Sequence, residues 1–74
     1  LLEQEVAIIF AVTNGYADDV PVAKIAAWEE AFHRFMANNH PEIGQAILRD
    51  KALSDATVAS LRAAIEEFKR TVTV

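Results

Sequence analysis

Asp18 and Asp19 are the residues of this chain that come nearest, by type and spacing, to a metal or acid–base site. Adjacent carboxylates can hold a cation or exchange protons. A glycosidase, however, needs two acids facing each other across a cleft, and a calcium loop needs alternating oxygen donors over about twelve residues. This pair has no such companions in the sequence. We therefore interpret the two aspartates as residues that stabilise the positive end of the helix expected to follow them.

His33 and His40 are the next candidates, because neutral imidazole is a common metal ligand. They are seven residues apart, which is about two helical turns, but His40 lies beyond the expected end of its helix. Two histidines without cysteine are also too few for a structural zinc site of the usual kind. We expect no shared metal site, and we expect His40 to help cap the helix that begins at Pro41.

Ser54 and the aromatic residues give no stronger indication of chemistry. Ser54 lacks the Gly-rich elbow and the nearby base of a nucleophilic serine, and it is better placed as a helix N-cap. Trp28, Phe32 and Phe35 could form a stacking platform, but basic residues that would hold phosphates are missing near them, so core packing is preferred. No phosphate loop, dinucleotide fingerprint or zinc motif occurs in the sequence. The residues alone therefore predict no catalytic, cofactor-binding or metal-binding side chain.

The composition fits one small folded domain spanning residues 1–74, with 53% hydrophobic and 24% charged residues. Cysteine is absent, which excludes disulfides and thiol catalysis. The net charge of −4 argues against nucleic acid as a partner. The longest apolar run, residues 6–12, is far shorter than the ~20 residues that span a bilayer, so we expect no membrane insertion. The chain starts with Leu rather than Met, and we expect it to be a fragment of a longer one.

Charge is unevenly distributed along the chain. Residues 1–33 hold six acids and one base, a net −5, whereas residues 34–74 hold five acids and six bases, a net +1. The acidic part could face a basic partner, but solvated helix faces are the preferred interpretation.

The hydrophobic pattern predicts an all-α fold, a small bundle of about four helices. Residues 1–12 form the first, which we expect to end at Thr13-Asn14-Gly15 and to bury Leu2, Val6, Ile9 and Phe10, with Ile8 and Val12 off that stripe. Because β-branched residues are frequent here, a buried strand is the alternative, but no partner strand is visible elsewhere.

The other three helices each have a clear apolar stripe. The second is expected to begin near Pro21 and to bury Ile25, Trp28, Phe32, Phe35 and Met36. The third, residues 41–50, has Ile43, Ala46 and Ile47 on one side. The fourth, after Ser54, is expected to bury Val58, Leu61, Ile65, Phe68 and Val72 and to cover its solvent face with Arg62, Glu66, Glu67, Lys69 and Arg70. We expect Trp28 and Phe68 to share one core.

One segment resembles a known family. Residues 13–22, TNGYADDVPV, follow the apolar residues 6–11, VAIIFA, and together they closely resemble the C-terminal region of the alpha subunit of F-type ATP synthases. Residues 40–43, 51–55 and 64–69 also look like that family, so the match is collinear over essentially the whole chain. The chain differs from the usual pattern of that family at Val12, Ala17 and Trp28. These differences are changes of apolar packing.

The resemblance implies the last part of the helical domain of the alpha subunit. Its implied role is non-catalytic, structural and regulatory: it supports proton-gradient-driven ATP synthesis by packing in the alpha–beta ring around the rotor stalk. The implied partners are the beta subunits and the stalk, on the cytoplasmic face of the bacterial plasma membrane or its mitochondrial or chloroplast equivalent, with the fragment itself soluble. The parent subunit is expected to bind ATP and magnesium in an upstream domain, so no cofactor is assigned to residues 1–74.

Two further expectations complete the sequence interpretation. A free-standing helical adaptor, which binds partner helices through an exposed groove, is the alternative function. Because earlier helices of the domain would be missing, we expect the isolated chain to self-associate through its first helix, and we expect Ile8→Glu to weaken that association.

Overall fold

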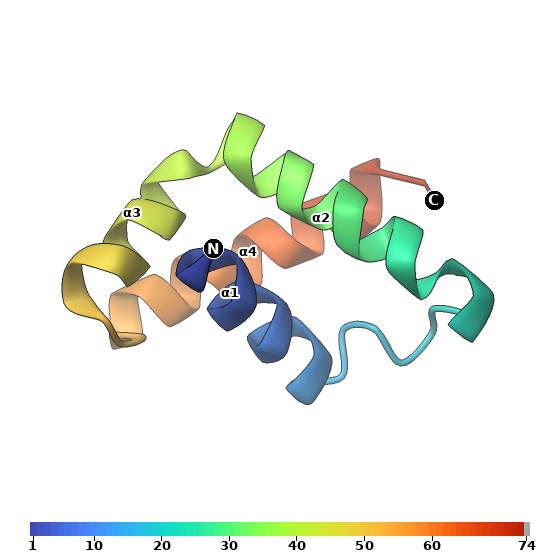
Figure 1. The fold of residues 1–74 in the computed structure, drawn as a ribbon, viewed down its shortest axis with the longest axis horizontal. Helices are drawn as coiled ribbons and strands as arrows, with labels where there is room; N and C mark the ends of the chain where they lie inside the picture. The colour runs from blue at the N-terminus through green and yellow to red at the C-terminus, as the bar shows by residue number, and fades with distance from the viewer. Residues whose placement is uncertain (74) are drawn as a thin grey trace.

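The computed structural model describes residues 1–73 and confirms the all-α prediction (Figure 1). The elements in chain order are α1 (Leu2–Thr13), the 3-10 turn η1 (Val22–Lys24), α2 (Ile25–Asn39), α3 (Pro41–Asp50) and α4 (Asp55–Thr71). Residues 1–73 contain no strand, so the alternative of a buried strand at residues 1–12 is wrong. The second helix begins later than predicted, because η1 occupies the residues that follow Pro21.

The turn after α1 forms as its residue types predict. Gly15 has a φ of 82°, a left-handed conformation that costs glycine little and strains other residues. The Asn14 side chain and backbone amides both donate to the carbonyl of Phe10, at 2.8 and 3.1 Å. These bonds satisfy a carbonyl at the helix end that has no partner within the helix. The chain therefore leaves α1 sharply and crosses to α2.

Proline and serine set the next two helix starts. α3 begins at Pro41, directly after His40, and so only one residue separates it from α2. Ser54 precedes α4 and its hydroxyl accepts a 3.2 Å hydrogen bond from the Thr57 backbone N–H, which confirms the predicted N-cap. A cap of this kind is worth about 1 kcal/mol.

An aromatic cluster forms the centre of the core. Phe32 and Phe68 are fully buried, and Trp28 stacks on Phe32 with 5.7 Å between ring centroids. Phe68 meets the Trp28 indole edge-on at 5.5 Å, which confirms that α2 faces α4 in one core. Ile43 and Ile47 of α3 are buried in the same cluster, and α3 contacts each of the other three helices.

The buried face of α1 differs from the predicted one. Ala7, Phe10 and Ala11 are buried, whereas Leu2 and Ile9, which were expected to face the core, are 50% and 59% exposed. Ile8, expected off the stripe, packs partly buried against the core. Small alanines let α1 lie close to its neighbours: a Cβ on Gly44 of α3 would lie only 3.3 Å from the Glu3 side chain. α1 therefore turns two alanines and Phe10 to the core and leaves the larger Leu2 and Ile9 half-exposed.

Candidate functional site

The two aspartates singled out from the sequence lie before η1 and not at the start of α2. No acidic residue occupies the first turn of either helix, so the interpretation that the pair stabilises the start of the following helix is wrong. Asp19 instead binds α4: its Oδ1 lies 2.8 Å from Lys69 Nζ. The hydrogen bond and the charge of Lys69 lower the pKa of the Asp19 carboxyl. Asp18 is exposed beside it.

Two basic residues of α4 hold the whole turn that connects α1 to η1. Lys69 also donates to the backbone carbonyl of Tyr16 at 2.6 Å. Arg62 donates to the Tyr16 hydroxyl at 3.2 Å and to Asn14 Oδ1 at 3.3 Å, and its guanidinium lies 5.1 Å from the centroid of the Phe10 ring. Arg62 and Lys69 are exposed, as expected for the solvent face of α4, and they also bind this turn. The spacing of basic residues along α4 does not pair them with a turn so far away in the sequence.

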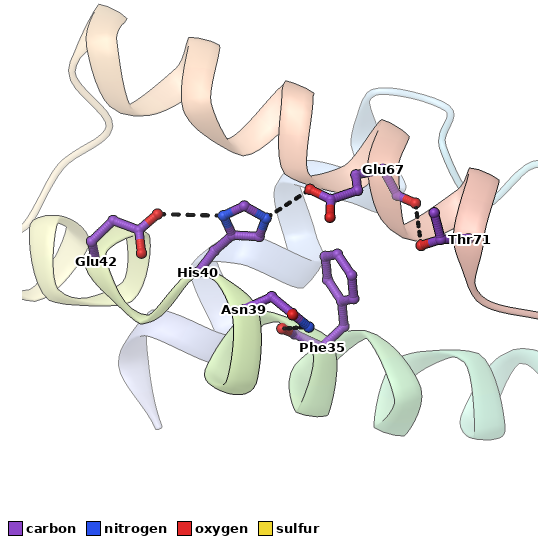
Figure 2. Close-up of polar contacts among 6 residues, drawn as sticks. All are labelled: Phe35, Asn39, His40, Glu42, Glu67 and Thr71. Atoms are coloured by element: carbon purple, nitrogen blue, oxygen red, sulfur yellow. Dashed lines mark hydrogen bonds and ion pairs between the residues drawn. The ribbon is translucent and has the colours of Figure 1, made fainter.

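His40 forms a second polar cluster, with Glu67 of α4 and Glu42 of α3 (Figure 2). Its Nε2 lies 2.9 Å from Glu67 Oε1, and its Nδ1 lies 3.4 Å from Glu42 Oε2. The hydrogen bond to Glu67 is the main cause of a raised His40 pKa, and partial burial opposes it. The side chain does not cap α3; the His40 backbone carbonyl does so, by accepting from the N–H of Ile43 at 3.1 Å. Glu67, expected on the solvent face, is half-buried and its carboxylate also contacts His40.

His33 and His40 line the same cavity, which has a volume of about 230 Å³. It lies among α1, α2 and α3, and its walls are mainly aliphatic, from residues such as Met36, Ile43 and Ile47. In residues 1–73 no group of three or more His, Asp or Glu side chains is arranged to hold a metal ion. That no catalytic, cofactor or metal residue exists in the chain stays a prediction.

The remaining candidates have structural roles. Trp28, Phe32 and Phe35 are buried, and all three rings lie within 5.6 Å of the Phe68 centroid. Ser54 is engaged with Thr57 at the start of α4. These interpretations from the sequence are confirmed.

The outer face of α1, defined by Leu2, Ile9 and Val12, is the part of the surface that best fits contact with another protein. These three side chains are 46–59% exposed, and they follow one another along one side of the helix, with Glu5 between them. Exposed apolar side chains gathered on one face are typical of interaction surfaces. The arrangement can bury apolar area against a partner.

Comparison with known proteins gives the family of the chain. The family model for the ATP synthase alpha/beta chain, C terminal domain, matches residues 1–68. The chain belongs to this family. The alpha subunit of the ATP synthase of Clostridium kluyveri is 42% identical over 69 residues, which are 93% of this chain and 14% of that subunit.

Membership of the ATP synthase alpha/beta C-terminal domain family confirms the resemblance recognised in the sequence. The alpha/beta C-terminal domain is part of the ATP synthase complex, which is associated with a membrane. Within the described residues 1–73, no helix is both long and apolar enough to cross a bilayer. The chain spans only a small part of the relative that it matches, so the activity of the complete subunit is a separate question.

Proposed function

We propose that residues 1–74 form a non-catalytic, structural and regulatory module of an ATP synthase alpha subunit. In this role the module packs in the alpha–beta ring around the rotor stalk and supports proton-gradient-driven ATP synthesis. Its partners are the beta subunits and the stalk, at the cytoplasmic face of the bacterial plasma membrane or the equivalent organellar membrane. ATP and magnesium bind elsewhere in the longer subunit to which the module belongs.

The match of residues 1–68 to the alpha/beta C-terminal domain is the observation that carries this proposal. The 42% identity to a clostridial alpha subunit favours alpha over beta.

The physical properties of the chain support a mechanical role. Its core is close-packed around Phe32 and Phe68, and such an interior is nearly incompressible, so the helices can hold their geometry under load. The ties from Arg62 and Lys69 to the turn after α1 fix that turn on α4. The outer face of α1 remains available to a neighbouring protein.

A chimeric alpha subunit tests the proposal. The 69 matched residues of the clostridial alpha subunit are replaced by those of this chain, and the chimera is mixed with beta subunits. Native mass spectrometry is expected to show that the chimera and beta subunits form a complex of about the same mass as the parent alpha subunit forms with them. A folded chimera that does not associate with beta subunits would contradict the proposal, and binding of unrelated amphipathic helices instead would favour the adaptor alternative.

A further inference from the structure

His40 is the single residue between α2 and α3, and its side chain joins this junction to α4. Nε2 lies 2.9 Å from Oε1 of Glu67, which is 27 residues further along the chain, and Nδ1 lies 3.4 Å from Oε2 of Glu42 in the first turn of α3. Figure 2 shows the imidazole ring between the two carboxylates. Each ring nitrogen therefore faces an acidic oxygen.

The protonation state of the ring decides whether both contacts can be hydrogen bonds. An imidazolium carries two N–H donors, whereas a neutral imidazole carries one donor and one acceptor. An ionised carboxylate only accepts. A neutral His40 thus leaves one nitrogen lone pair facing a carboxylate oxygen, while the cation donates to both Glu42 and Glu67 through charge-assisted bonds.

We propose that protonated His40 is a pH-operated clamp that fixes the α2–α3 junction to α4 and releases it when the ring loses its proton. The release acts on α3, because this helix begins at Pro41, the residue next to His40. It also acts on the cavity among α1, α2 and α3, which both His40 and Pro41 line. The proposal concerns the stability of this fold and does not depend on the function of the chain in an ATP synthase.

The surroundings of His40 favour the cation. The charged neighbours are Glu67 from α4 and Glu42 from α3, and their hydrogen bonds and charges raise the His40 pKa, while burial lowers it. From the other two helices, Glu3 of α1 and His33 of α2 line the cavity that His40 also lines. The ring of Phe35 lies 5.6 Å from the imidazole centroid and helps to cover it.

A raised pKa in the folded state fixes the sign of the pH dependence. The clamp contributes its full stability below the unfolded pKa of histidine, about 6.5. The contribution is lost as pH rises through the higher, folded pKa of His40. Mild alkalinisation should therefore loosen α3 while the aromatic core between α2 and α4 stays packed.

Nitrogen NMR of the wild-type 74-residue chain tests the protonation state directly. We expect His40 to titrate at a higher pH than histidine in the unfolded chain, about 6.5, with both ring nitrogens protonated below its midpoint. We also expect the backbone amide signals of Ile43 and Gly44 to shift with the same midpoint as the ring. A His40 midpoint at or below about 6.5, or α3 amides that ignore its titration, would overturn the clamp.

Two matched variants identify the partner. Glu67→Gln keeps the shape of the side chain and removes its charge, while Glu66→Gln makes the same change at the exposed neighbour on α4. We expect Glu67→Gln to lower the titration midpoint of His40 clearly. In this variant the unfolding midpoint should also fall less steeply with pH above about pH 6.5. Glu66→Gln should have a much smaller effect on both quantities. Equal shifts in the two variants would mean a general charge effect and would overturn the proposal. If Glu67→Gln does not fold, the wild-type titration decides alone.

Discussion

The ring of Phe68 meets the indole of Trp28 edge-on, with 5.5 Å between the centroids and 71° between the planes. Phe68 also contacts Phe32 and Phe35, so one residue of α4 packs against three aromatic side chains of α2. Edge-to-face aromatic pairs contribute about 0.5–1.5 kcal/mol beyond the area that they bury. The α2–α4 contact is therefore the centre of this fold.

Phe68→Ala is expected to cost about 3–5 kcal/mol of unfolding free energy, because it leaves a cavity among three rings. A small domain has only about 5–15 kcal/mol in total, so the variant should be close to unfolding at room temperature. Urea unfolding followed by the fluorescence of Trp28, the single tryptophan of the chain, measures the change. Phe68→Leu, which retains most of the volume, should lose less. Stability like that of the wild type in Phe68→Ala would contradict this account of the core.

Ile9→Glu is expected to weaken self-association of the isolated chain and to leave its helicity nearly unchanged. Ile9 is exposed on the outer face of α1, and apolar area buried in a dimer contributes about 25 cal/mol per Å². From the sequence alone, Ile8→Glu is the variant expected to weaken the association. Ile8 packs against the core, so that variant should instead destabilise the monomer.

Sedimentation at several concentrations, together with far-UV circular dichroism, separates the two variants. Val22→Glu is a suitable control, because Val22 is 90% exposed and lies away from α1 in η1. A wild-type chain that stays monomeric at high concentration would refute the association.

Asp19→Asn is expected to remove part of the acid sensitivity of the chain. Lys69 lowers the pKa of Asp19 in the folded state. The pair therefore stabilises the fold at pH values above the unfolded pKa of the carboxyl, about 3.9. This stabilisation is lost as pH falls through the lower pKa of the folded state. The difference in melting temperature between wild type and Asp19→Asn should therefore shrink below about pH 4 and also at high salt, since the pair is at the surface.

Asp18→Asn is the matched control for this pair, because it removes the same charge one residue away and Lys69 hydrogen-bonds to Asp19. If the two variants show the same dependence on pH, the contact with Lys69 is not its cause.

The isolated chain is expected to bind neither ATP nor ADP. Phosphates are held by Gly-rich loops at helix N-termini, often with a neighbouring lysine. Gly15 lies in the turn after α1 and Gly44 lies inside α3, and neither has a lysine beside it in the sequence. Titration calorimetry with Mg-ATP should show no saturable heat. A saturable site of micromolar affinity would contradict the non-catalytic assignment.

Much of this fold could be predicted from the sequence, because turn residues, helix caps and apolar spacing all indicate the same helices. The apolar stripe of α2, the N-cap at Ser54 and the turn at Gly15 all form where residue type and spacing indicate. Trp28 and Phe68 could be paired because a chain of this length can hardly support two cores.

The contacts between helices could not be predicted in the same way. A helix that is apolar over most of its circumference, such as α1, offers several faces to the core. The packing that buries Ala7 and Ala11 and brings Glu3 close to Gly44 selects one of them only in three dimensions. The pairs His40–Glu67 and Asp19–Lys69 join residues 27 and 50 positions apart. Helical spacing along one chain segment carries no information about them.

ATP synthesis in membrane vesicles is the most direct test of the central claim, that this domain serves as a non-catalytic part of an alpha subunit. The vesicles carry an ATP synthase in which the 69 matched residues of this chain replace the matching part of the clostridial alpha subunit. We expect an imposed proton gradient to drive synthesis at a rate comparable to that of the parent enzyme, with unchanged affinity for ADP. A folded, membrane-bound chimera that makes no ATP, or one whose nucleotide affinity has changed, would contradict the claim.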